Sequence, residues 1–506
     1  MIFLLATTFL DVEHWNWVRV EDPDHPQAVA SSHTGALLYE RPEPGTAWRY
    51  ASIPEPDIWP ATEALEVTNA ELWHADGAKG QGVKLAVFDI GWFGGDADPS
   101  EVGEYTSHDC FVQRSCDAPI DHFRPRRGSE SGIHGFACAE VVRDVAPEVE
   151  LHLVRVNGFT MFENAARWAI RNDIDVISMS MSFYNDSFYD GSGPFSRIIA
   201  ELEANDILLV TSSGNNAKQH WRGTYTDADG DGRMDFDGSN SLAIEVNPGG
   251  SNLYVNWNQH GRCGDTDLDA YIYSSDGYLV GSSAEDQSDR ADQCQPIERV
   301  NANSVFGGIH RLEIHHQTGL SSFVEVDVLA RSGSIPKGQP DRSLTDPGTH
   351  RDVFAVGAVR ASNYFNGSVE GFSSWGPSNN GVAKPDIAGP DGLSTDAYGP
   401  VGFFGTSAST PVVAALIAVV MSDDPSLTPR QAARKLQSWA LSDDLSVSEP
   451  DPRWGAGKVR LPVTNPQTSP CGRRPLVMWL FALPVWWFRS RSSGFRKRVR
   501  KDRQLR

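Results

Sequence analysis

The chain alternates short, continuously apolar runs with segments that have the periodicity of helices. The apolar runs are residues 83–88, 151–156, 174–179, 207–211 and 353–359, and helical stretches include residues 162–172, 195–205 and 429–440. Strands that are apolar on both faces are typical of a parallel sheet covered on both sides. The pattern predicts an α/β fold in which helices cover both faces of a parallel sheet. In such sheets a ligand site lies at the carboxyl ends of the strands.

A second pattern interrupts this alternation. Between about residues 226 and 335, apolar residues alternate with polar ones, as at Leu253, Val255 and Trp257, and turns rich in Gly, Ser, Asn and Asp separate the runs. This predicts an inserted all-β module, a small jelly roll or sandwich. We expect four regions. Residues 1–69 form an N-terminal region with a remnant signal or propeptide, and residues 70–225 with 336–462 form the α/β domain. Residues 226–335 form the β insert, and residues 463–506 form a tail.

Charge is distributed unevenly along the chain. The 506 residues carry a net charge of −22, yet the tail from residue 471 to residue 506 contains eleven Lys or Arg and one acid. An acidic body repels phosphate backbones, which argues against nucleic acid as the main partner. Such a body is typical of an exported protein or of one that binds cations.

Both ends of the chain bear on export. Residues 1–10 are apolar but lack the positive residues of a signal peptide, so we expect a truncated signal or an alternative start. Cys471-Gly472, the apolar run 475–488 and a basic tail resemble the tripartite C-terminal sorting signals of some Gram-negative surface proteins. A terminal amphipathic or core helix with a solvated basic tail is the alternative. The expected location is secreted or cell surface, with membrane contact through the tail before processing.

Six cysteines occur, at positions 110, 116, 138, 263, 294 and 471. Because they show no CxxC spacing of a metal site, we predict the disulfides Cys110–Cys116 and Cys263–Cys294, and hence an oxidising compartment. Cys138 lies in an apolar helical run, and we expect it to be a buried free thiol.

Two polar residues stand where a parallel sheet places reactive groups. Asp89 ends a buried strand and Gly91 follows it closely. A turn or helix cap is the alternative interpretation. His134 opens an apolar helix after a glycine-rich approach that would let a substrate backbone come close; a histidine satisfied within the core is the alternative.

Ser407 and Asn215 add a nucleophile and a hydrogen-bond donor. Ser407 lies directly before the run 412–421, which is apolar on every side and therefore predicts a buried helix. The N-terminus of that helix would direct free N–H groups at the hydroxyl, where an oxyanion could be stabilised. Asn215 follows the strand 207–211, and its amide can donate to an oxyanion. Helix capping by Ser407 and a turn role for Asn215 are the alternatives.

Together these segments resemble the subtilisin-like serine proteases, or subtilases, which carry Asp, His and Ser in this order on a parallel α/β sheet. The residues 174–182, 371–377 and 384–390 also match, and the segment 405–411, Gly-Thr-Ser-Ala-Ser-Thr-Pro, is the most specific. The likeness covers residues 70–225 and 336–462. It implies that Asp89, His134 and Ser407 form a catalytic triad and that Asn215 is the oxyanion donor. It also implies a substrate-binding set of Ser180, Met181, Ser182 and Gly214.

The chain departs from the family at a few positions. Ile90 and Phe136 replace the usual Ser or Thr after the triad Asp and the usual Thr two residues after the His, and Ser182 and Phe183 stand where the binding strand usually has Gly. The predicted function is a monomeric serine endopeptidase that acts on proteins or peptides. A catalytically impaired, calcium-stabilised surface binding protein is the alternative. A GxSxG esterase is a weaker third candidate, because the second Gly is lacking.

Alternating carboxylates open the insert. The ligands would be Asp227, Asp229, Asp231, the Arg233 carbonyl and Asp235, with Gly at the sixth position, a spacing that wraps oxygen atoms around Ca²⁺. The run resembles dockerin-type and EF-hand loops, although Gly238 stands where a bidentate Glu is expected. We predict a structural calcium site; an unoccupied acidic turn is the alternative.

Overall fold

A computed structural model describes the backbone of residues 15–19, 28–31, 36–40 and 441–443, and describes residues 62–92, 99–111, 114–120, 132–260, 266–287, 295–319, 323–440 and 451–463 in full. The first three segments form a small sheet of β1 (Trp15–Arg19), β3 (Ala36–Glu40) and β2 (Ala28–Ser31), in that order. Three predictions lie outside the described residues: the Cys263–Cys294 disulfide, the apolar start of the chain and the sorting tail.

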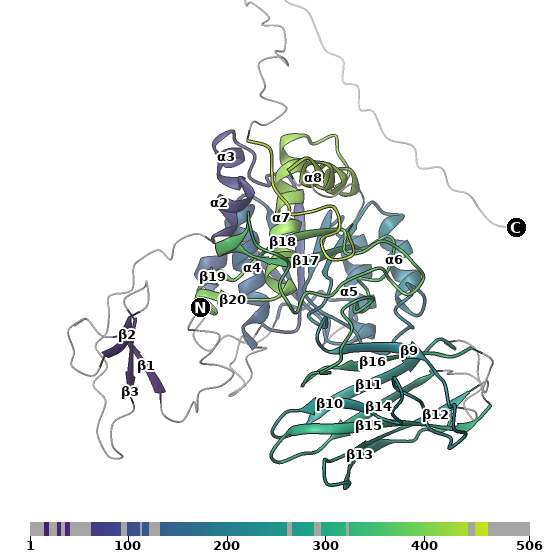
Figure 1. Ribbon diagram of the computed structural model, residues 1–506. Coiled ribbons are helices and arrows are strands. Elements are labelled where there is room, and N and C mark those ends of the chain that lie inside the picture. The colour runs from purple at the N-terminus through teal and green to yellow at the C-terminus, as the bar shows by residue number, and fades with distance from the viewer. Residues whose placement is uncertain are drawn as a thin grey trace, which may run out of the picture.

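Seven parallel strands form the centre of the α/β body (Figure 1). Their order across the sheet is β18 (Ile387–Asp391), β17 (Phe354–Arg360), β8 (Leu208–Ser212), β7 (Val176–Met179), β4 (Lys84–Asp89), β6 (Glu150–Arg155) and β5 (Tyr105–Asp109). The five predicted apolar runs are all strands here, which confirms the α/β fold.

The sequence did not reveal β5 and β18, and both are edge strands. β5 is mostly polar, and only Asp109 among its residues is fully buried, so it lacks the continuous apolar run of the central strands. β18 contains Pro390, whose missing N–H an edge strand tolerates.

Helices cover both faces of this sheet. Leu85 and Val87 of β4 belong to the core that contains α4 (His134–Val145), α7 (Thr406–Asp423) and α8 (Pro429–Asp443). The alternate residues Ala86 and Phe88 belong to the opposite core, with α5 (Phe159–Arg171) and α6 (Phe195–Glu203). The short helices α2 (Ala64–Thr68) and α3 (Ala70–Ala75) join the first layer. The sheet is therefore buried on both sides, as predicted.

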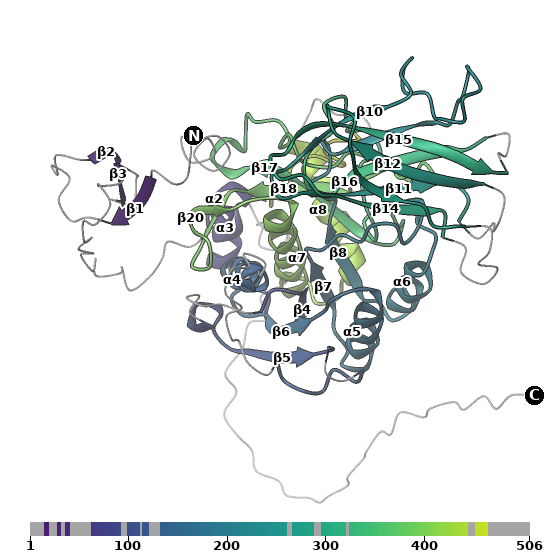
Figure 2. The same ribbon diagram turned by 90° about the horizontal axis from the view of Figure 1, so that it is seen from below.

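Helix α7 runs along the sheet inside the first of these layers (Figure 2). Among the described residues it is the one helix long and apolar enough to span a membrane, but 83% of its apolar window is buried within the protein. The helix is therefore apolar because it lies in the core, and the sequence predicted this burial.

The insert is a jelly roll of two four-stranded sheets, and it lies below the α/β body in Figure 1. Each early strand pairs antiparallel with a late one: β9 with β16, β10 with β15, β11 with β14, and β12 with β13. Such nested pairing is that of a long hairpin rolled into two sheets, and it confirms the predicted all-β insert. The strands are β9 (His220–Thr224), β10 (Leu242–Val246), β11 (Ser251–Trp257), β12 (Asp267–Tyr273), β13 (Leu279–Ser283), β14 (Ile297–Ala302), β15 (Gly308–Thr318) and β16 (Glu325–Ala330). The four region boundaries stay predictions.

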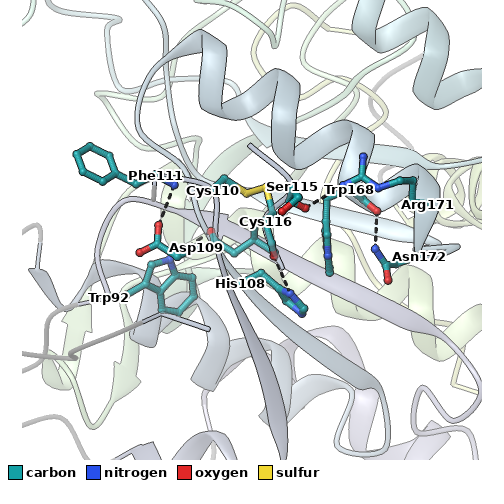
Figure 3. Close-up of a disulfide and its surroundings, with 11 residues drawn as sticks. Trp92, His108, Asp109, Cys110, Phe111, Ser115, Cys116, Trp168, Arg171 and Asn172 are labelled. Atoms are coloured by element: carbon teal, nitrogen blue, oxygen red, sulfur yellow. Dashed lines mark hydrogen bonds between the residues drawn. A yellow bond between two sulfur atoms is a disulfide. The ribbon is translucent and has the colours of Figure 1, made fainter. Parts of the chain in front are cut away.

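A disulfide closes the loop after the edge strand β5 (Figure 3). Cys110 and Cys116 are bonded, as predicted, and both are buried. The Cys116 carbonyl lies 3.2 Å from Nδ1 of His108, whose ring packs 4.2 Å from that of Trp168 on α5. The disulfide thus closes this loop, and the His108 ring connects the sheet edge to the helix layer.

Candidate active site

Asp89 ends β4 in the middle of the sheet, and its side chain is completely buried. Its Oδ1 accepts a hydrogen bond from the Gly91 N–H at 2.8 Å, and its Oδ2 lies 2.7 Å from Nδ1 of His134. Gly135 lets the two segments approach, because a Cβ there would lie 2.7 Å from the Gly91 carbonyl oxygen. The carboxylate is therefore held in one orientation by two separate partners.

His134 is the first residue of α4, and 22% of its side chain is exposed. Nδ1–H donates to Asp89, which leaves Nε2 as the acceptor nitrogen of the neutral ring. Phe403 packs edge-on against the imidazole, with 5.6 Å between ring centroids. Burial is the largest single effect on the pKa of His134 and lowers it, but the charge and hydrogen bond of Asp89, together with Cys138, hold that pKa well above 6.5.

Ser407 lies in the first turn of α7, partly exposed between buried neighbours. Its carbonyl oxygen accepts a hydrogen bond from Ser180 Oγ at 2.9 Å and lies 3.8 Å from the Cys138 Sγ. That sulfur is 4.0 Å from Nδ1 of His134, so Cys138 joins the first turn of α7 to the histidine. Within the described structure, no hydrogen bond links the Ser407 hydroxyl to His134; in proteases without substrate this contact is often long.

Asn215 follows β8 and is exposed. Its Oδ1 accepts hydrogen bonds from the backbone N–H and the hydroxyl of Thr406, at 3.0 and 2.9 Å. With the oxygen occupied, the Nδ2 group is the one directed to a ligand beside Ser407. Gly405 has a φ of 105°, and a Cβ there would lie 3.1 Å from Nδ2, so the glycine keeps this amide uncovered.

The predicted substrate-binding residues lie on two neighbouring chain segments. Ser180 is buried, whereas Met181 and Ser182 are partly exposed on the continuation of β7. Gly214 follows the adjacent strand β8 with a φ of 106°, and a Cβ there would meet Asn216 Nδ2 at 2.8 Å. The two segments continue two paired parallel strands, so they lie side by side at the carboxyl edge of the sheet. Their role in substrate binding stays a prediction.

The two departures from the family pattern have different surroundings. Ile90 is 37% exposed, so the usual hydroxyl is missing from a surface position and not from the buried core. Phe136 is buried and packs edge-to-face against Trp92, with 5.6 Å between ring centroids. Phe136 therefore fills the core beside the turn after Asp89. A Thr at this position would leave space next to Trp92.

Sequence reasoning missed two residues that shape this site. Cys138 was expected as a buried free thiol, which it is, but not as a contact of His134 and Ser407. Phe403 was not singled out at all. For Cys138 the signal available in the sequence was position, because it lies one helical turn after His134 on the same helix. Phe403 gave no such signal, because its contact with His134 joins residues far apart in the chain.

Three carboxylates converge at the start of the insert. Oxygen atoms of Asp227, Asp229 and Asp231 lie within 4.8 Å of one another. Asp227 already accepts the N–H groups of Gly230, Asp231 and Gly232, which shapes the loop around it. These residues fit a hard cation such as Ca²⁺. Asp231 also pairs with the Arg233 guanidinium, and Asp235 accepts the Ala228 N–H, so a bound cation would compete with both contacts.

Comparison with known proteins identifies relatives for the α/β body. A sequence profile of the subtilase family matches residues 80–257 and 318–457. An uncharacterised protein of Aquifex aeolicus is 30% identical over 146 residues, or 23% of this chain and 66% of that protein. The serine protease AprX of Bacillus subtilis is 29% identical over 142 residues, or 24% of this chain and 31% of that protein. The match thus spans less than two thirds of either relative.

One solved structure resembles this chain over most of its length. The CspB protease of Clostridium perfringens has a TM-score of 0.55 and 15% sequence identity, and the likeness covers 79% of this chain and 97% of that one. At this identity the likeness concerns the fold.

Proposed function

Because the chain belongs to the subtilase family, we propose that it is a serine endopeptidase in which Asp89, His134 and Ser407 form the catalytic triad. The observation that carries this proposal is the 2.7 Å contact between Asp89 Oδ2 and His134 Nδ1, beside the first turn of α7. A buried carboxylate in this position fixes the imidazole tautomer and stabilises its protonated form. Protein or peptide substrates follow from the family.

The chemistry would proceed from Nε2 of His134. As the Ser407 hydroxyl attacks the peptide carbonyl, Nε2 takes its proton and later gives it to the leaving amine. The negative oxygen that forms would be bound by Nδ2 of Asn215 and by the Ser407 N–H, which has no acceptor among the described residues. The Thr406 contacts hold that amide in place before substrate arrives, so no reorganisation is needed during the reaction.

A fluorophosphonate probe and casein test the proposed triad. The parent is expected to be labelled at Ser407 and to degrade casein, and Ser407→Ala is expected to do neither. Ser409→Ala is the matched control, since Ser409 lies on the same helix but is fully buried and donates to the Gly389 carbonyl. A folded parent that is neither labelled nor active would favour the catalytically impaired binding protein.

We also propose a structural calcium ion at Asp227, Asp229 and Asp231. Its contribution would be to neutralise the converging carboxylates and fix the entry to the jelly roll. Calcium is expected to raise the melting temperature of the parent and to leave the double variant Asp229→Ala with Asp231→Ala unchanged. The control is Glu66→Ala with Glu71→Ala, two exposed acids elsewhere. Equal calcium responses in both double variants would contradict the site.

We propose that the protein is exported to the cell surface or the medium, and the disulfide supports this proposal. The Cys110–Cys116 bond is typical of oxidising compartments. Detection of the chain in the medium or on intact cells, with this bond oxidised, would support export; a purely cytoplasmic, reduced chain would contradict it.

A further inference from the structure

The jelly roll is joined to the α/β body next to the candidate site. Strand β9 begins at His220, shortly after Asn215, so the insert leaves the body at the oxyanion segment. The chain that continues from Ser182 contacts both the α/β body and the jelly roll. We call residues 183–190 the bridging segment.

Both bodies fix the bridging segment. On the body side, the Phe183 N–H donates to the Asp346 carbonyl at 2.9 Å, and Ser187 Oγ donates to the Asp346 carboxylate at 2.6 Å. On the jelly-roll side, Asn256 Nδ2 donates to the Ser187 carbonyl at 2.6 Å, and the Arg222 guanidinium lies 4.9 Å from the centre of the Phe188 ring. The segment therefore has little freedom to move independently of the insert.

Tyr184 of the bridging segment connects three parts of the molecule. Its ring stacks on Tyr254 of β11, with centroids 5.1 Å apart and planes within 9°. Its hydroxyl donates to Asn216 Oδ1 at 3.3 Å, next to the oxyanion donor Asn215. Tyr254 is buried and packs with Leu329, also of the jelly roll. Tyr184 thus spans from the segment after Ser180–Ser182 to the segment after Gly214, against a ring supplied by the insert.

From this geometry we infer that Tyr254 is a positioning residue for substrate selection: it holds the Tyr184 ring in the place where Tyr184 joins the segment after residues 180–182 to Asn216. The inference rests on the proposed function and deepens it. A ring fixed between the two predicted substrate-binding segments limits the room for the substrate residue before the scissile bond, so that residue must have a small side chain. The jelly roll is then part of the specificity apparatus and not only a spacer.

Two peptides that differ only in Ala or Phe before the scissile bond test this inference. The parent is expected to prefer Ala. Tyr184→Ala should raise the Phe-to-Ala ratio of kcat/KM about tenfold or more, because the ring that limits the space for the larger side chain is removed. Tyr254→Ala should raise it in the same direction, since the freed Tyr184 ring can turn aside. Tyr254→Phe keeps the stacking ring and should restore the parent ratio.

A matched control separates positioning from simple loss of stability. Ile244→Ala removes core volume from the jelly-roll sheet that does not contain Tyr254, so it should lower the melting temperature and leave the ratio unchanged. The same ratio is measured as dissociation constants of the two peptides for the Ser407→Ala form, so an inactive parent does not obscure the result. An unchanged ratio in folded Tyr184→Ala and Tyr254→Ala would overturn the inference.

Discussion

The two carboxylate oxygens of Asp89 have different partners, and this division explains why the residue tolerates complete burial. One oxygen is satisfied by the Gly91 N–H of its own turn, and the other faces His134. A buried carboxylate without such partners would be costly. The same logic applies to Asn215, whose oxygen is occupied by Thr406 so that its nitrogen stays directed to the ligand.

Replacing Asn215 by Ala should lower kcat by about 100- to 1,000-fold, a magnitude transferred from another subtilisin-like protease. KM should change little, because the Nδ2 contact forms mainly with the charged intermediate. Steady-state kinetics on a peptide substrate would measure the split. Lys218→Ala is the neighbouring control: Lys218 is exposed on the same segment, so a similar loss of kcat there would contradict the role given to Asn215.

The pH dependence of kcat/KM should report His134. The group must be neutral to take the serine proton, and the Asp89 carboxylate holds its pKa well above 6.5 despite the lowering effect of burial. Activity should therefore rise with pH through a midpoint clearly above 6.5. In any residual activity of Asp89→Asn the midpoint should fall, since the amide no longer stabilises the imidazolium. A parent midpoint at or below 6.5 would contradict the observed geometry.

At the scale of elements, the hairpin before α7 is tied to the helix that carries His134. The hairpin consists of β19 (Leu393–Thr395) and β20 (Gly399–Phe403). Oε2 of Glu140 on α4 accepts the Asp396 N–H at 2.7 Å, within the turn of that hairpin. At its other end, Phe403 packs against the His134 ring. Glu140 therefore helps to set the aromatic wall beside the imidazole.

The Glu140→Gln variant should become more stable than the parent as the pH rises. Burial raises the pKa of Glu140 to about 8, so the folded state keeps a proton that the unfolded state loses near pH 4.5. The stabilisation by that proton is complete below the unfolded pKa and is lost as the pH rises to about 8. The melting temperature of Glu140→Gln minus that of the parent should grow between pH 5 and 8, by about 3 °C or more. A gap that stays constant with pH would contradict this.

How far the sequence predicts these elements depends on whether their signal is local. The central strand of Asp89 is a continuous apolar run, and Ser407 stands in a short, specific motif, so both could be found by inspection. The contact of Cys138 with Ser407 spans 269 residues, and the Tyr184–Tyr254 stack joins two modules. Nothing in the local pattern at Tyr254 distinguishes a ring beside the site from an ordinary strand residue. Likewise, the raised pKa of Glu140 follows from burial, which composition does not reveal.

At the scale of the whole molecule, buried carboxyl groups are spread over both bodies. Burial raises the pKa of Glu140 to about 8, and the pKa values of Glu298, Asp346 and Asp391 to about 7. Glu298 lies in the jelly roll, and Asp391 ends β18 and accepts the Gly405 N–H near the candidate nucleophile. Deprotonation would therefore weaken the insert and the α/β body over the same pH range.

The melting temperature should fall steadily between pH 6.5 and 8.5. In this window the folded state binds protons on these carboxyls that the unfolded state has already released, so stability declines with pH. His134, with its raised pKa, contributes to the fall in stability in the same direction. Burial lowers the pKa of other histidines, such as His260 and His350, so they change the stability with pH only below this window. Glu140→Gln combined with Asp391→Asn should show a shallower decline. Since kcat/KM rises over the same range, the protein is expected to be most active at a pH where it is less stable. A melting temperature that stayed level or rose up to pH 8.5 would contradict this expectation.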